Sequence, residues 1–302
     1  MKVKKWRRYL LLILTAIAII ALVAYIFSKS TTATNAENDG EFRIIPTTIA
    51  LTDTMDALDL DIVGKPTTSK DLPERYADVP EIGSSHSPDA EIVMSLTPTH
   101  VLSVTTLKSE MDFFYEKVDM DPIYYDYDSV EGMLDSITEM GETFDRKKEA
   151  KTLVDSIQEV VDQAKEKAEQ QTNKPTVLIL MGLPGSYQVC TSTSYIGDLV
   201  EIVGAENVIT DTSASYLESN TEYLNSVNPD IILRLSHAYP TQVKEMFDEE
   251  FANNQIWSTF SAVQNGKVYD LDEEPFGITA NIDAGDAIKQ LYELIYGVSW
   301  DA

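Results

Sequence analysis

Two segments far apart in the chain share the same pattern of hydrophobic and polar residues. EIVMSLTPTHVLSV spans residues 91–104 and EYLNSVNPDIILRL spans residues 222–235, with Glu, Ser, Pro and Leu at matching places. In each, apolar residues at helical spacing are followed by a Pro turn and then by a continuous apolar run. Each segment therefore predicts a short amphipathic helix, a turn and a buried strand.

The repeat extends upstream of both segments. IALTDTMDALDLDIVG ends at Gly64 and SYIGDLVEIVG ends at Gly204, and each pattern predicts a helix closed by glycine. Strand-like runs precede these helices at residues 42–46 and 176–181. The fold class we expect is α/β, with two pseudo-duplicated lobes that are each built on a mostly parallel sheet.

A long helix is predicted between the lobes. Residues 144–171 contain neither Gly nor Pro, and apolar side chains recur at helical spacing from Leu153 to Ala168. Such a helix is about 40 Å long at 1.5 Å per residue. We therefore expect an N-terminal lobe at 41–143, a stiff bridging helix at 144–172 and a C-terminal lobe at 173–302, with little movement between the lobes.

The N-terminal segment predicts the compartment. Five basic residues precede the uncharged run YLLLILTAIAIIALVAYIF at 9–27, which is long enough to span a bilayer. We expect residues 1–29 to form a basic cytoplasmic stub and an uncleaved transmembrane anchor, residues 30–40 a flexible tether, and the remainder an extracellular domain on the cell membrane. A cleaved signal peptide is the alternative.

Charge and cysteine content narrow the function classes. Six of the 23 Lys and Arg lie in the first 29 residues, so 17 basic residues face 50 acidic ones in the rest of the chain. This excess of acids repels phosphate backbones and argues against nucleic-acid binding. Cys190 is the only cysteine, which excludes an intrachain disulfide and a lipid-bearing cysteine after the span. We expect its thiol to be buried.

Two of the three histidines are candidate metal ligands. His86 lies in EIGSSHSPDAE, where Ser87 is expected to cap a helix that starts at Pro88, and the positive end of that helix favours neutral imidazole. His237 follows the strand at 230–235 and so lies at the rim where open α/β sheets bind ligands. Two imidazoles from opposite lobes suit a planar complex coordinated above and below, such as haem iron. A hydrogen-bonded loop histidine is the simpler alternative for His86.

Other candidates have weaker signals. His100 aligns with a buried strand position, and we expect it, like Met94, to be a core residue. Tyr239 is able to donate a phenolate oxygen or to pack on the ligand. Residues 181–189 contain Gly185 and Ser186, whose backbone amides are able to cradle a carboxylate, but the nucleophile-elbow and Walker spacings are absent. Three alternatives stay open: a siderophore or corrinoid receptor, a surface zinc-binding protein that uses His100, and an extracellular enzyme.

Long runs of the chain resemble the haem receptors of the iron-regulated surface determinant system. They cover roughly residues 41–296 and include VGKPTTSKDLPERYADVPEIG, LSVTTL, VLILMGLPGSY, SYIGDLVEIVGAENVI, NTEYLNSVNPDIILR and VYDLDEEPFGITAN. The resemblance implies a class III substrate-binding protein of an ABC importer, monomeric and non-enzymatic, with haem b as its transported ligand and cell-surface proteins as possible donors. It implies a shallow binding cleft, to which we assign Lys70, Gly185, Ser186, Tyr187 and Tyr239.

The resemblance also assigns the axial ligands and a docking surface. His237 matches the histidine ligand of the family, whereas His86 stands where the family has methionine. The chain also departs from the family in lacking the lipid-anchor cysteine. Exposed glutamates that dock on the permease in related receptors match Glu91 and Glu222; the alternative is that each supports the first turn of its helix.

Overall fold

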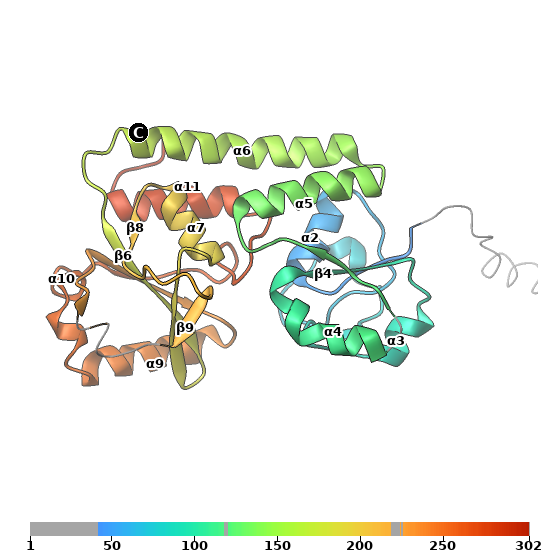
Figure 1. Cartoon of the computed structure of the whole chain (residues 1–302), viewed down its shortest axis with the longest axis horizontal. Helices are drawn as coiled ribbons and strands as arrows, with labels where there is room; N and C mark the ends of the chain where they lie inside the picture. Colours follow the sequence, from blue (N-terminus) through green and yellow to red (C-terminus); the bar gives the residue numbers. More distant parts are fainter. Residues whose placement is uncertain (1–41, 118–119, 219–223, 225, 302) are drawn as a thin grey trace, which may run out of the picture. The chain divides into compact units, whose positions relative to one another are not determined.

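The computed structural model describes the chain except for residues 1–41, 118–119, 219–223, 225 and 302 (Figure 1). The predicted membrane anchor, the tether and Glu222 therefore lie outside the described residues. Within the part that is described, no helix is long and apolar enough to cross a membrane. Residues 42–302 form one compact unit.

The N-terminal lobe is built on a parallel sheet with strand order β1-β4-β5. Strands β1 and β4 are almost wholly buried, whereas β5 is buried only at Tyr125. The strands are β1 (Ile44–Pro46), β4 (His100–Val104) and β5 (Ile123–Tyr125), and the helices are α2 (Ile49–Ala57), α3 (Ala90–Ser95) and α4 (Lys108–Lys117). Helix, Pro turn and strand thus follow one another in the first repeat as the sequence predicts.

The C-terminal lobe contains a mixed sheet with strand order β11-β10-β6-β7-β9, and β8 pairs with β6. The β6–β7 and β7–β9 pairs are antiparallel, and the other pairs are parallel. The strands are β6 (Thr176–Leu183), β7 (Ser186–Cys190), β8 (Glu206–Asn207), β9 (Tyr216–Glu218), β10 (Ile231–Ser236) and β11 (Val268–Asp270). The helices are α7 (Tyr195–Ile202), α9 (Pro240–Asn253), α10 (Ser261–Gln264) and α11 (Ala284–Tyr296).

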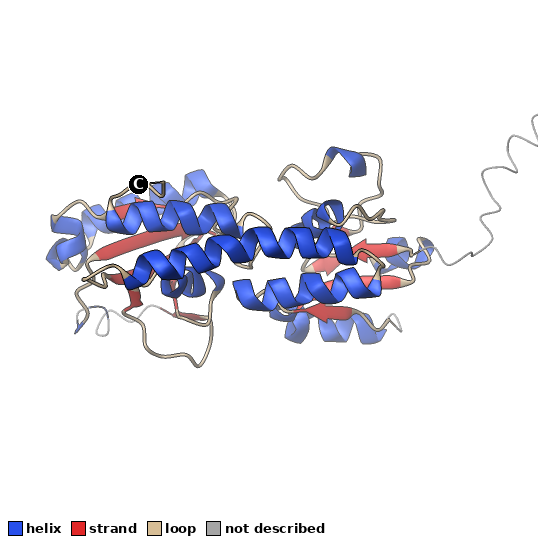
Figure 2. Cartoon of the chain, turned by 90° about the horizontal axis from the view of Figure 1, so that it is seen from above, coloured by secondary structure: helices blue, strands red, loops and turns tan. Residues whose placement is uncertain are grey.

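The predicted bridging helix is present but shorter than expected. Helix α5 (Val130–Thr143) ends at a turn in which Asp145 has a φ of 56°, and α6 (Lys147–Glu169) then runs along both lobes (Figures 1 and 2). The left-handed turn at Asp145 breaks the helix that the sequence predicts to begin at residue 144. Helix α6 packs against α5 and α11 through its buried stripe.

One of the two predicted glycine caps is wrong. Helix α2 ends at Ala57, and the chain turns at Asp59 with a φ of 52°, so Gly64 lies well beyond the helix. Gly204 has a φ of 80° and follows α7 directly, as the sequence predicts. An aspartate is able to adopt the left-handed conformation, and here it replaces the expected glycine.

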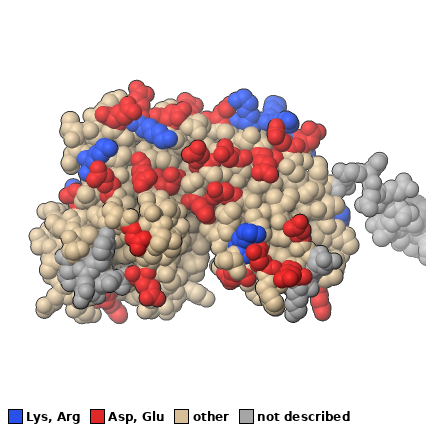
Figure 3. Space-filling view, in the orientation of Figure 1, with Lys and Arg blue, Asp and Glu red and all other residues tan. Residues whose placement is uncertain are grey.

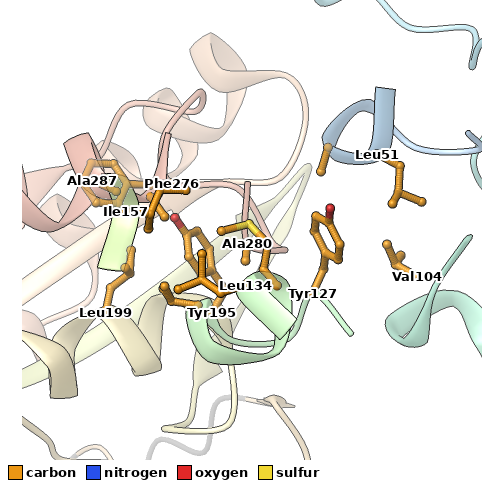
Figure 4. Packing of buried hydrophobic residues seen from close by; sticks show 14 of the residues in the cluster. Leu51, Val104, Tyr127, Leu134, Ile157, Tyr195, Leu199, Phe276, Ala280 and Ala287 are labelled. Carbon is orange, nitrogen blue, oxygen red and sulfur yellow. The ribbon is translucent and has the colours of Figure 1, made fainter. Parts of the chain in front are cut away.

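The larger hydrophobic cluster of the described residues contains side chains from both lobes (Figure 4), and a second cluster lies within the C-terminal lobe. Hydrogen bonds accompany the larger cluster: the Tyr127 hydroxyl lies 2.8 Å from the Thr54 hydroxyl, and the Ala280 amide donates to the Tyr127 carbonyl at 2.8 Å. The Val130 amide donates to the Asp198 carboxylate at 2.8 Å. The contact between the lobes is thus a packed core and not an open hinge, which favours the small relative movement expected from the sequence.

Candidate functional site

His86 lies at the tip of a β-hairpin and not beside a helix end. Strand β2 (Gly83–Ser84) pairs with β3 (Ser87–Pro88), and the two-residue turn between them holds His86. Gly83 has a φ of 95°, and a Cβ there would lie 2.6 Å from the Ser87 carbonyl oxygen, so this position requires glycine.

The predicted start of the following helix is therefore wrong. Helix α3 begins at Ala90, and Asp89 caps it by accepting hydrogen bonds from the amides of Glu91 and Ile92. Ser87 and Pro88 are in the hairpin instead. Asp is as good an N-cap as Ser, so SPDAE offers two capping registers, and the hairpin selects the later one.

A carboxylate contacts the His86 ring. Nδ1 lies 3.1 Å from Oε1 and 3.0 Å from Oε2 of Glu110, a residue in the first turn of α4. Both side chains are about half exposed, His86 at 50% and Glu110 at 53%. With Nδ1 hydrogen-bonded, Nε2 is the nitrogen left to coordinate a ligand.

His237 follows the end of β10 directly, as the sequence predicts. Its amide donates to the Gly182 carbonyl at 3.0 Å, which ties the residue to the end of β6. The next two residues, Ala238 and Tyr239, have positive φ angles of 68° and 52°. Consecutive left-handed non-glycine residues are strained and cluster at functional sites. This turn leaves the side chain of Tyr239 67% exposed, two residues beyond His237 at the carboxyl end of β10.

Ion pairs hold the strand that carries His237. The Arg234 side chain on β10 is 8% exposed and makes two hydrogen bonds to the Asp270 carboxylate, at 2.6 and 2.9 Å. It also contacts Asp248 of α9 at 3.0 Å. Burial raises the pKa of Asp270, but the hydrogen bonds from Arg234 and Lys244 prevail and hold that pKa below its usual range.

Three charged or titratable side chains from the two lobes act on His237. Burial lowers the pKa of His237, the charge of His86 lowers it further, Glu273 raises it and Lys70 lowers it. The Lys70 ammonium also pairs with the Glu273 carboxylate at 3.3 Å across the lobes. Such charge effects fall off within roughly 10 Å, so His86 lies near His237 although the two residues belong to different lobes. Figure 3 shows a notch between the lobes on the side away from α6.

The predicted glycine-rich segment forms the β6–β7 hairpin. Gly185 has a φ of 83° at its tip, where a Cβ would meet no atom within 4 Å, and Ser186 beside it is exposed. The ring of Tyr187 packs against Phe247 and Trp257 with centroids about 6 Å apart. Gly185 and Ser186 thus lie on an open surface, whereas the Tyr187 ring packs within the C-terminal lobe.

Of the two residues that the sequence assigns to the core, His100 is held as expected and Met94 is not. His100 is held as predicted: Nδ1 lies 2.9 Å from the Thr99 hydroxyl, the ring packs edge-on against Phe42 and Phe144, and burial lowers its pKa. Met94 is 54% exposed, so its assignment to the core is wrong; it lies on the outer face of a six-residue helix.

Cys190 is fully buried, and burial raises the pKa of its thiol, as the sequence predicts. Glu91 is exposed in the first turn of α3, where Asp89 already provides the cap. No three His, Cys, Asp or Glu side chains are grouped to hold a metal ion in the described ranges.

Glu110 is the site residue that the sequence does not reveal. It lies 24 positions after His86 in an acidic segment, SEMDFFYEK, and nothing distinguishes it from its exposed neighbours. A pattern of solvated charges is the ordinary interpretation of such a helix.

Comparisons with known proteins cover most of the chain. The sequence pattern of one family, described as periplasmic binding protein, matches residues 44–275. The high-affinity heme uptake system protein IsdE of Staphylococcus aureus (strain Newman) is 54% identical over 280 residues, which are 93% of this chain and 96% of that protein.

Solved structures agree with the sequence matches. The crystal structure of S. aureus IsdE complexed with heme has a TM-score of 0.83 and 57% identity, and the match covers 85% of this chain and all of that one. An ABC transporter substrate-binding protein from Listeria monocytogenes EGD-e has a TM-score of 0.80 and 49% identity, with 85% and 100% covered.

Proposed function

Since this chain belongs to the periplasmic binding protein family, we propose that it is the haem-binding receptor of an ABC importer for iron acquisition. The relative at 54% identity is named for heme uptake, and its matching structure holds heme. Such a receptor binds its cargo and presents it to a permease, and it performs no chemical conversion.

One observation supports the proposal: the charge of His86, on the N-terminal lobe, acts on His237 of the C-terminal lobe. We propose that their Nε2 atoms coordinate the haem iron on opposite faces. Tyr239 and Lys70 lie at the same rim, where an aromatic ring packs on the porphyrin and an ammonium pairs with a propionate. Gly185 and Ser186 complete this surface with exposed backbone.

A siderophore or corrinoid receptor is the second candidate. Such ligands are held by cationic and aromatic side chains and do not need two imidazoles. Among the described residues, Lys70 is a cation whose charge acts on His237, and it is already paired with Glu273. The pair of histidines therefore favours haem.

The membrane and permease contacts are part of the same proposal. We propose that the hydrophobic run at 9–27 anchors the receptor at the cell surface and that Glu91 and Glu222, one on each lobe, dock on the permease. The exposed position of Glu91 supports docking because Asp89 caps α3 in its place. Reversing both glutamates to Lys is expected to abolish haem import and to leave haem binding intact; surviving import would contradict docking.

Titration of the full chain with haem tests the proposed function. A Soret band that saturates at one haem per chain is the expected result. Absence of saturable binding, or equally tight binding of a metal-free siderophore, would contradict it. The double variant His86→Ala, His237→Ala provides the matched control, and we expect it to lose the sharp band.

A further inference from the structure

We propose that Glu110 is a positioning residue that holds the His86 ring with its proton on Nδ1, so that Nε2 is free to coordinate iron. This inference rests on the proposed function. Its observation is the contact of both Glu110 oxygens with Nδ1, at 3.1 and 3.0 Å.

The hairpin needs such a contact. His86 lies on a two-residue turn and is half exposed, so the packing of the hairpin alone does not fix the orientation of its ring. The base of the hairpin is fixed, since the Asp89 amide donates to the Ile82 carbonyl at 2.6 Å and the Ile82 amide donates to the Lys65 carbonyl at 2.9 Å. The backbone is thus placed while the side chain requires an external partner.

Helix α4 is able to provide a fixed partner. Met111 and Tyr115 on this helix are both 2% exposed and anchor it in the core of the N-terminal lobe. Glu110 precedes Met111, so its carboxylate extends from an anchored turn and does not move with the hairpin. The contact therefore restrains the ring against the body of the lobe.

The chemistry of the contact is specific. A carboxylate accepts the Nδ1 proton, selects the tautomer with an unprotonated Nε2 and raises the basicity of that atom, and removing such a partner costs 10–100-fold in metal affinity. A more basic, partly anionic imidazole stabilises ferric iron over ferrous iron. For His237, no hydrogen bond of the imidazole to a described residue is seen, so the two ligands would differ in strength.

Two variants separate charge from orientation. Glu110→Gln keeps an oxygen that accepts the Nδ1 proton but removes the negative charge, whereas Glu110→Ala removes both. Glu116→Gln, at an exposed position of the same helix, makes the same change in net charge away from His86 and is the control.

Nitrogen NMR of the full chain without haem gives the first readout. At about pH 8 we expect the His86 proton on Nδ1 in the wild type and in Glu110→Gln, and a shift toward the Nε2-protonated tautomer in Glu110→Ala. A proton on Nε2 in the wild type would overturn the proposal. This result does not depend on haem, so it is independent of whether the proposed function holds.

The midpoint potential of bound haem gives the second readout. If Glu110→Gln weakens ferric binding about tenfold and leaves ferrous binding unchanged, the potential rises by about 59 mV for one electron. Glu116→Gln is expected to leave it unchanged. Equal potentials in the wild type and both Gln variants would overturn the proposal, whereas a wild type that binds no haem would contradict the proposed function alone.

Discussion

The two proposed ligands, His86 and His237, stand on very different supports. His86 stands on an exposed two-residue hairpin and is held by one carboxylate, whereas His237 follows a buried strand whose Arg234 is locked by two acidic side chains. The first proposed ligand is oriented through its side chain, and the second is oriented through its backbone. We therefore expect substitutions near the two histidines to have unequal effects.

The largest effect is expected from the support of His237. Asp270→Asn leaves the buried Arg234 guanidinium without its main partner, which costs about 3–5 kcal/mol of unfolding free energy. Denaturant unfolding of the apo protein measures it. Asp59→Asn is the control, since Asp59 pairs with Arg75 while 77% exposed, and such surface pairs contribute about 1 kcal/mol or less. Equal losses of unfolding free energy in the two variants would show that the Arg234–Asp270 pair stabilises β10 no more than a surface ion pair does.

The second largest effect is expected from replacing the two proposed ligands, and the loss of haem affinity should differ between them. His237→Ala is expected to weaken ferric haem binding about 100-fold, or about 2.8 kcal/mol, because the rigid strand end offers no replacement. His86→Ala is expected to cost about tenfold, since water is able to enter at the exposed hairpin. Haem titrations compare the two, with His100→Ala as the control. A larger loss for His86→Ala would reverse the comparison.

The carboxyl group of Asp53 predicts that the stability of the folded protein depends on pH. Burial, followed by the charges of Asp283 and Asp56, raises the pKa of Asp53 on α2 to about 6. The folded chain then binds this proton more tightly than the unfolded chain. The contribution of Asp53 to stability is therefore unfavourable above pH 6 and disappears as the pH falls toward the ordinary value of 3.8.

Asp53→Asn should accordingly stabilise the protein at about pH 7.5. The shift alone would correspond to about 3 kcal/mol, and solvent screening at this partly exposed site reduces the expected gain to about 1 kcal/mol. Thermal unfolding at about pH 7.5 and pH 4 measures it, with no gain expected at the lower pH. Asp135→Asn on the exposed face of α5 is the control. A gain that is independent of pH would contradict this account.

The smallest change is expected in the overall shape. The core shared by the two lobes and helix α6 resist domain closure, so haem should alter the solution-scattering radius of gyration only slightly. A marked compaction on binding would mean that the supports of His86 and His237 move together, as in hinge-closing receptors.

Local patterns are sufficient to predict one half of the site. Residues 230–235 form an apolar run after a Pro turn, so both the strand and the position of His237 at its end follow from the sequence. Helix α6 is likewise visible in its spacing of apolar residues. These features depend on neighbours in sequence, where periodicity is informative.

The other half depends on contacts that sequence spacing does not encode. The Ser85–His86 turn lacks the Asn-Gly or Asp-Gly pair typical of two-residue hairpins, so the SPDAE capping pattern dominates its interpretation. The partner of His86 lies on a different helix, and its acidic surroundings conceal it. The ion pair on β10 is hidden in the sequence in the same way. Arg234 meets Asp270 only because β10 pairs in parallel with β11.

The ferric electron paramagnetic resonance spectrum of the haem-loaded full chain tests the central claim most directly. Coordination by one imidazole from each lobe predicts a low-spin, six-coordinate signal that becomes high-spin in both His86→Ala and His237→Ala and is unchanged in His100→Ala. A high-spin signal in the wild type, or a low-spin signal that survives either ligand substitution, would contradict axial ligation by His86 and His237.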